Sequence, residues 1–263
     1  MYVFVRGLFR KLFSFFNLGL VKKKDLKNLN QIFIDYTCLL NKLSFFLLFD
    51  KKINEIENNS SNGMKLLFES KSQNGQDLFA LLANDFKKSG VFLEFGAYDG
   101  VIFSNTHLLE RFFGWNGILL DPIPEHFKRM ELNRKCKLIH GAVTAEQQDT
   151  VLIEELAASD LSKFVKKRNI LKKIHEVKAF TLSQIMNQYL ISNEIDFLSI
   201  DTEGNELEIL KSIDFNRYKI KAVCVEHNFR EGSEEMIKFM ANNGYEHLYS
   251  EYSKNDYWFV LKN

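Results

Sequence analysis

Acidic residues and glycines gather where a short apolar run, residues 91–95, gives way to a loop. The loop reads Glu94-Phe95-Gly96-Ala97-Tyr98-Asp99-Gly100. Gly96 and Gly100 allow the backbone to turn sharply and to approach a ligand closely. A second apolar run ends in Asp121, roughly twenty residues further on, where a carboxylate can accept hydrogen bonds from both ribose hydroxyls of a nucleoside. The spacing therefore predicts a cofactor that contains a nucleoside.

Two cofactors fit this spacing, a dinucleotide and S-adenosylmethionine. A dinucleotide needs a G-x-G-x-x-G loop whose bare backbone amides cradle its pyrophosphate. Here Ala97 and Asp99 stand between Gly96 and Gly100, and one glycine of that pattern is missing. The carboxylates of Glu94 and Asp99 would repel a pyrophosphate and favour a ligand with an ammonium and a sulfonium group. The loop therefore favours S-adenosylmethionine, and a glycine turn with capping carboxylates and no ligand is the alternative.

Two more acidic clusters follow later apolar runs. They are Asp201-Thr202-Glu203-Gly204-Asn205-Glu206 and Glu226-His227-Asn228. A sulfonium methyl group is already electrophilic, so an enzyme mainly has to align the acceptor and remove its proton. A neutral histidine accepts a proton near neutral pH, whereas a carboxylate is a weaker base unless burial raises its pKa. We therefore predict that His227 is the base and that Asp201 positions the acceptor or the donor's methionine end, with Glu226 as a further candidate base.

Two alternatives for these clusters stay open. Asp201, Glu226 and Asn228 offer the oxygen ligands that Mg²⁺ prefers, and a bound cation would acidify an acceptor hydroxyl. The sequence holds no tight metal-binding motif, so no metal ligand is assigned. In the other alternative, His227 only hydrogen-bonds the loop above the sheet.

The apolar runs predict an α/β fold with a doubly wound, mostly parallel sheet. Short continuous runs of this kind suit strands that are covered on both faces. Pro124 predicts a helix start, Thr181 and Gln184 form a capping-box pair, and Gly244 predicts a helix end. The expected strands are 91–95, 118–120, 138–140, 195–200 and 220–225, followed by an antiparallel edge pair, 245–249 and 257–261, with no helix between its members.

Residues 145–180 interrupt this alternation of strands and helices. We expect a strand at residues 150–153 and a basic helical stretch around residues 166–168 and 172–173. Insertions between the strands of an open sheet often carry substrate contacts. A solvated basic face is the alternative for these lysines.

The first 63 residues are expected to form a helical extension, and residues 64–263 the main domain. Residues 1–24 combine a stripe that contains Arg6 and Arg10 with an aromatic body, which suits a helix in a membrane interface or one packed on protein. Residues 31–50 are apolar, and residues 54–63 form a polar linker. No run reaches the roughly 20 apolar residues of a spanning helix.

The composition indicates a globular protein. The net charge is +1, which argues against a protein that coats nucleic acid. The three cysteines, Cys38, Cys136 and Cys224, are far apart, so we expect neither a disulfide framework nor a zinc site. The expected location is the cytoplasm, and an interfacial helix at residues 1–24 would add peripheral contact with the inner membrane face.

Six sequence blocks occur in order across roughly residues 65–263. They are Ser72-Gln73-Asn74-Gly75-Gln76-Asp77, the Glu94–Gly100 loop, Ser104-Asn105-Thr106, Gly114-Trp115-Asn116-Gly117, Asp201–Glu206 and Glu226-His227-Asn228. Together these blocks resemble the FkbM-type methyltransferases. The resemblance implies a class I methyltransferase sheet, S-adenosylmethionine as donor, and usually O-methylation of a sugar or polyketide hydroxyl. We also predict donor contacts at Asn105 and Ala142. Asp121 stands where the family more often has glutamate, which keeps the charge but shortens the reach.

The leading hypothesis is therefore a methyltransferase that acts on a hydroxyl group of a glycan or another small molecule. A nicotinamide-dependent oxidoreductase is the second hypothesis, which the missing glycine and Asp99 disfavour. The third is a nucleotide-binding or membrane-associated scaffold without catalysis. A scaffold has no need for the acidic clusters at residues 201–206 and 226–228.

Overall fold

The computed structural model describes residues 38–43, 45, 60–155, 173–189, 192–228 and 233–262. The chain divides into two compact units, Met1–Leu40 and Asn41–Asn263, and the elements described below belong to the second. The predicted interfacial helix at residues 1–24 lies outside the described residues. Among the residues that are described, no helix is long and apolar enough to cross a membrane.

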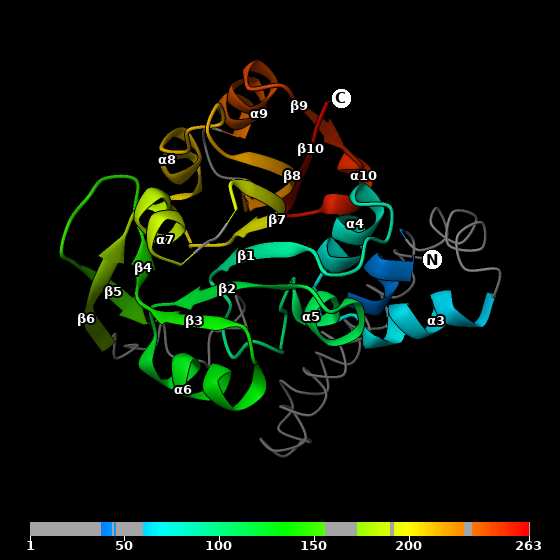
Figure 1. Ribbon diagram of the computed structural model, residues 1–263, viewed down its shortest axis with the longest axis horizontal. Helices are drawn as coiled ribbons and strands as arrows, with labels where there is room; N and C mark the ends of the chain where they lie inside the picture. Colours follow the sequence, from blue (N-terminus) through cyan, green and yellow to red (C-terminus); the bar gives the residue numbers. More distant parts are fainter. Residues whose placement is uncertain are drawn as a thin grey trace, which may run out of the picture. The chain divides into compact units, whose positions relative to one another are not determined.

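A seven-stranded sheet in the order β3-β2-β1-β7-β8-β10-β9 forms the core (Figure 1). The first five strands in that order are parallel, and β10 runs antiparallel to both β8 and β9. This confirms the predicted α/β class and the antiparallel pair at one edge. The strands are β1 (Val91–Phe95), β2 (Asn116–Asp121), β3 (Lys137–His140), β7 (Glu194–Ile200), β8 (Lys219–Glu226), β9 (Tyr245–Leu248) and β10 (Asp256–Leu261).

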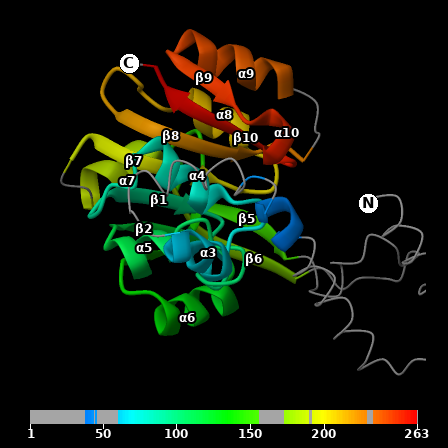
Figure 2. The same ribbon diagram turned by 90° about the vertical axis from the view of Figure 1, so that its right-hand side faces the viewer.

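Helices cover both faces of this sheet, which explains why most residues of its central strands are apolar and buried. One face packs against α7, α8 and α9 in a single buried cluster, and α9 lies along β9 (Figure 2). On the other face, Phe79 of α4 stacks on Trp258 of β10 with ring centroids 5.0 Å apart. The helices are α3 (Ser60–Glu69), α4 (Gln76–Ala83), α5 (His107–Phe113), α6 (Pro124–Asn133), α7 (Leu182–Tyr189), α8 (Glu206–Lys211), α9 (Ser233–Asn242) and α10 (Ser250–Ser253).

The predicted helix signals are confirmed. Pro124 is the first residue of α6. The amide of Thr181 donates to Gln184 Oε1 over 2.8 Å, and the amide of Gln184 donates to Thr181 Oγ1 over 3.2 Å, which is the reciprocal pattern of a capping box. Gly244 follows α9 with φ +86°, a conformation that glycine adopts without strain.

Three local predictions were wrong. The one-turn helix α10 lies between the two strands of the edge pair. Residues 60–63 of the predicted linker begin α3. Lys173 begins a strand rather than ending a helix, because β6 (Lys173–Phe180) pairs with β5 (Thr150–Glu155) and with β4 (Ala142–Val143) in a second, three-stranded sheet. Residues 166–168 and Lys172 lie outside the described residues.

The second unit begins at Asn41, and the side chains of Lys42 and Phe45, which precede the expected domain boundary at residue 64, are buried in it. The boundary itself stays a prediction. Phe45 is fully buried, and its ring centroid lies 4.9 Å from that of Trp258. Lys42 donates its Nζ proton to the carbonyl of Ser70 over 2.9 Å. Sequence patterns do not report such contacts, since they join segments that are far apart in the chain.

Candidate active site

The strand order reverses between β1 and β7, so the loops that follow these strands diverge. In open α/β sheets such a point, at the carboxyl ends of the strands, is where ligands bind. The loop 96–100 follows β1, and Asp201 follows β7 directly. Glu226 is the last residue of β8, which neighbours β7. The structure therefore brings the two acidic clusters together at the carboxyl ends of neighbouring strands, as the sequence predicted.

Gly96 allows the β1 loop to pass against the end of β7. Its φ is +82°, and a Cβ atom there would lie 1.8 Å from the carbonyl oxygen of Asp201. The glycine is required by this close approach of two backbones. At Gly100, with φ +78°, a Cβ atom would meet the side chain of Arg134 at 2.7 Å. Both glycines thus serve contacts within the protein.

The carboxylate of Glu94 lies inside the protein. It accepts hydrogen bonds from the amide of Asn105 over 2.7 Å and from the hydroxyls of Ser104 and Thr106. The side chain is buried, and this burial raises the pKa of Glu94 although the Arg134 guanidinium opposes the rise. The sequence suggested direct contact with a ligand, whereas these contacts give Glu94 the task of holding the segment 104–106 beside β1.

Asp99 also bonds within its own loop. Its Oδ1 accepts hydrogen bonds from the amides of Val101 over 2.9 Å and Ile102 over 2.8 Å. The side chain is buried. This is the capping arrangement that the sequence offered as the alternative to ligand contact.

Asp121 is the last residue of β2, and its side chain is hydrogen-bonded both to the loop 96–100 and to the start of α6. Its Oδ2 accepts the amide proton of Tyr98 over 2.8 Å, and its Oδ1 accepts that of Ile123 over 2.9 Å. The same Oδ1 lies 3.0 Å from Nδ1 of His126. The amide of Gly141 donates to the backbone carbonyl of Asp121, which places Ala142 and β4 next to this end of the sheet.

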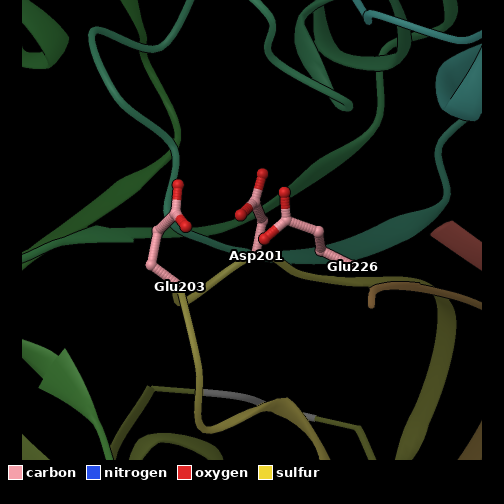
Figure 3. A group of neighbouring side chains, drawn as sticks. All are labelled: Asp201, Glu203 and Glu226. Atoms are coloured by element: carbon pink, nitrogen blue, oxygen red, sulfur yellow. The ribbon is translucent and has the colours of Figure 1, made fainter. Parts of the chain in front are cut away.

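Three carboxylates face one another beyond β7 and β8, namely those of Asp201, Glu203 and Glu226 (Figure 3). One oxygen from each lies within 4.8 Å of the others. Burial is the main reason that the pKa of Asp201 is raised well above its usual value, and the charge of Glu226 adds to it. Burial, followed by the charge of Glu203, raises the pKa of Glu226 to about 7. We call Asp201 and Glu226 the carboxyl pair. Because of these shifts, the carboxyl pair holds a proton up to near-neutral pH.

The sequence did not predict a fourth acid, Asp256, next to this pair. Asp256 is the first residue of β10 and the direct partner of Glu226 across the strands. It is buried, and burial raises its pKa to about 6. Gln76 donates from Nε2 to Asp256 Oδ2, so part of the Ser72–Asp77 block holds this acid. Glu226 and Asp256 are distant in the sequence, and only the strand register brings them together.

His227, the predicted base, packs on the edge strands. Its ring stacks on Tyr257 with centroids 4.1 Å apart and an interplanar angle of 23°. Its amide donates to the carbonyl of Asn255 over 2.8 Å. Burial lowers the pKa of His227, and His247 lowers it further. The side chain is buried, at 8% exposure, and its predicted role stays a prediction.

The sequence of this domain matches one family model. The description of that model is methyltransferase FkbM domain, and it matches residues 94–247, more than half of the chain. The chain belongs to the FkbM methyltransferase family. The resemblance deduced from six sequence blocks is thereby confirmed, and with it a methyltransferase that uses S-adenosylmethionine. The family membership disfavours the nicotinamide-dependent alternative.

Solved structures similar to this FkbM methyltransferase chain are distant in sequence. A precorrin-6y C5,15-methyltransferase from Geobacter metallireducens has 9% identity and a TM-score of 0.42, over 73% of this chain and 88% of that one. A methyltransferase FkbM from Methylobacillus flagellatus has 12% identity and a TM-score of 0.42, over 66% of this chain and 44% of that one. This chain therefore spans less than half of the Methylobacillus chain. No curated protein matches the sequence.

The site of this FkbM methyltransferase fits the donor at Asn105. Its Nδ2 donates to the hydroxyl of Ser199 over 2.9 Å, whereas Oδ1 is buried and has no hydrogen-bond partner among the described residues. A buried oxygen without a partner is costly, so such an atom calls for an external donor. The ammonium group of S-adenosylmethionine is a donor of the required kind. The donor contact predicted for Asn105 fits the chemistry of this oxygen and stays a prediction.

Proposed function

We propose that this methyltransferase transfers a methyl group to a hydroxyl of a sugar or another small molecule. The observation that carries this proposal is the carboxyl pair, in which Glu226 has a pKa of about 7. A general base works best when its pKa lies near the operating pH. A hydroxyl keeps its proton in neutral water, so methyl transfer to its oxygen benefits from such a base.

In this proposal the chain's own residues hold the acceptor and take its proton. S-adenosylmethionine supplies an electrophilic methyl group when bound. An acceptor hydroxyl placed beside Glu226 would give its proton to a carboxylate oxygen of Glu226 as methyl transfer replaces the donor's carbon–sulfur bond by the new carbon–oxygen bond and leaves the sulfur electron pair on S-adenosylhomocysteine. Oε2 of Glu226 is buried and has no hydrogen-bond partner among the described residues. It is therefore the oxygen best placed to receive that proton, while the neighbouring Asp201 positions the acceptor.

Glu226 is a better candidate for the base than its neighbour His227. The sequence favoured His227 because an ordinary carboxylate is a weak base, with the reservation that burial can raise its pKa. Burial does raise the pKa of Glu226 to about 7. The same effect lowers the pKa of His227, which makes the imidazole a weaker base than usual. The stacked ring on Tyr257 suits a role in packing.

A second candidate mechanism uses a divalent cation. Asp201 and Glu226 were part of the magnesium site suggested by the sequence, and Glu203 joins them in the group of neighbouring oxygens. Chelation separates the two mechanisms, since proton transfer to a carboxylate base needs no metal. Loss of activity with a chelator and its return with magnesium would favour the cation.

Label transfer tests the proposed acceptor chemistry. The protein is incubated with S-adenosylmethionine carrying a deuterated methyl group and with glycan and lipid extracts from cells that lack the protein. Mass spectrometry then locates the label, and we expect it on a hydroxyl oxygen of a sugar or another small molecule. Label on nitrogen, sulfur or nucleic acid would contradict the proposal, while the family assignment would stand.

A further inference from the structure

A histidine that is not among the predicted site residues lies beside the end of β2. His126 lies in the first turn of α6, and its Nδ1 is 3.0 Å from Oδ1 of Asp121. Its ring contacts that of Tyr98, in the loop 96–100, with ring centroids 4.2 Å apart and an interplanar angle of 62°. The side chain of His126 is 22% exposed and that of Asp121 only 6%. At the predicted ribose position, the more accessible group is thus the histidine.

The hydrogen bond to Asp121 determines what the outer nitrogen of His126 can do. An ionised carboxylate only accepts hydrogen bonds, so Nδ1 must carry the proton in the neutral ring. Nε2 is then an acceptor, and it has no hydrogen-bond partner among the described residues. The edge-to-face contact with Tyr98 further restrains the ring. The result is an oriented acceptor at the end of the strand where nucleoside cofactors place their ribose.

Asp121 has little capacity left to accept from both ribose hydroxyls, because three of the roughly four acceptor sites of its carboxylate are in use. Its two oxygens already accept from the amides of Tyr98 and Ile123 and bind His126. His126 extends the reach of this end of the strand by the length of an imidazole ring.

We propose that His126 recognises the ribose of S-adenosylmethionine, and that Asp121 holds its ring for this purpose. A ribose hydroxyl donates its proton to Nε2, and the Asp121 carboxylate fixes the tautomer that leaves Nε2 free to accept. Asp121 is then a positioning residue, and His126 makes the contact. This inference concerns the donor alone and does not depend on the chemistry of the acceptor.

Calorimetry with S-adenosylhomocysteine and its 2′-deoxy and 3′-deoxy analogues tests this assignment without any turnover. The wild-type protein should bind the parent compound about 5- to 10-fold more tightly than at least one deoxy analogue, as expected for one neutral hydrogen bond. His126→Phe keeps a ring against Tyr98 and removes both nitrogens. It should weaken binding of the parent by a similar factor and abolish the preference over that analogue. His126→Ala should do the same.

His140 offers a matched control at the same edge of the sheet. It is the register partner of Asp121 in β3, and its Nε2 lies 3.1 Å from the carbonyl of Pro122. His140→Ala should leave the preference for ribose hydroxyls unchanged. Melting curves without ligand check that each variant is folded. The proposal is overturned if the His126 variants bind as tightly as wild type, or if they bind all three compounds more weakly but retain the preference.

Discussion

Glu226 and His227 are consecutive residues whose surroundings move their pKa values in opposite senses. Burial raises the pKa of the Glu226 carboxyl to about 7 and lowers that of the His227 imidazole. For both groups burial disfavours the charged form, which is the anion for glutamate and the cation for histidine. The candidate with the better basicity is therefore the carboxylate.

A pH profile of single-turnover methyl transfer distinguishes these two residues. A base must be deprotonated, so the wild-type rate should rise with pH, through a midpoint near the Glu226 pKa of about 7, to a plateau. Glu226→Gln should slow the reaction by about 10²- to 10⁴-fold and remove this limb, with little change in affinity for S-adenosylhomocysteine. His227→Gln should retain the limb. A limb that disappears in the His227→Gln variant and persists in the Glu226→Gln variant would reverse the assignment.

At the scale of elements, the close approach of β1 and β7 depends on one glycine. A Cβ atom on residue 96 would lie 1.8 Å from the carbonyl oxygen of Asp201, and the φ of +82° disfavours it further. The two strands would have to separate where the site lies.

Gly96→Ala should therefore destabilise the domain by more than about 2 kcal/mol and abolish binding of S-adenosylhomocysteine. Gly244→Ala is the matched control, since Gly244 has φ +86° but its nearest contact to an added Cβ, Leu261 Cδ1, is at 3.8 Å. It should lose only about 1 kcal/mol from backbone strain. Denaturant melts and calorimetry measure both effects. Equal losses in the two variants would show that the contact with Asp201 is unimportant.

At the scale of the whole molecule, the buried acids should make stability depend on pH in an unusual direction. The folded-state pKa values of Glu226 and Asp256 are raised to about 7 and about 6, and that of Asp201 is raised as well. The folded protein thus binds protons more tightly than the unfolded chain. The stability linked to these groups is fully present below the unfolded pKa values of about 4 and is lost as the pH rises towards 7.

Asp256→Asn removes one of these charges while its amide oxygen can still accept from Gln76. We expect the variant to gain melting temperature relative to wild type at pH 8, and to gain much less at pH 4, where the folded protein already holds Asp256 protonated. Thermal melts at both pH values measure this difference. A variant that is less stable than wild type at pH 8 would show that the Asp256 charge stabilises the fold.

The strands and several helix ends could be predicted because their signals are local. Continuous apolar runs identify β1, β2, β3, β7 and β8, and the Thr181–Gln184 pair and Gly244 identify helix ends within a few residues. Contacts between distant segments carry no such signal. Phe45 lies in the expected N-terminal extension, and its burial depends on contact with Trp258. Lys173 was expected in a helix, and its place in a strand depends on pairing with β5.

For the candidate site, the sequence by itself determined the family, the loop after β1 and the two acidic clusters, because these residues follow strand ends in a parallel sheet. Only the tertiary structure decided what each acid does. Glu94 and Asp99 bond within the protein, whereas Glu226 gains a near-neutral pKa from its burial and its charged neighbours. The reason is physical, since burial and the field of nearby charges depend on residues from distant parts of the chain. Gln76 and Asp256, for example, are hydrogen-bonded to each other although they lie 180 positions apart.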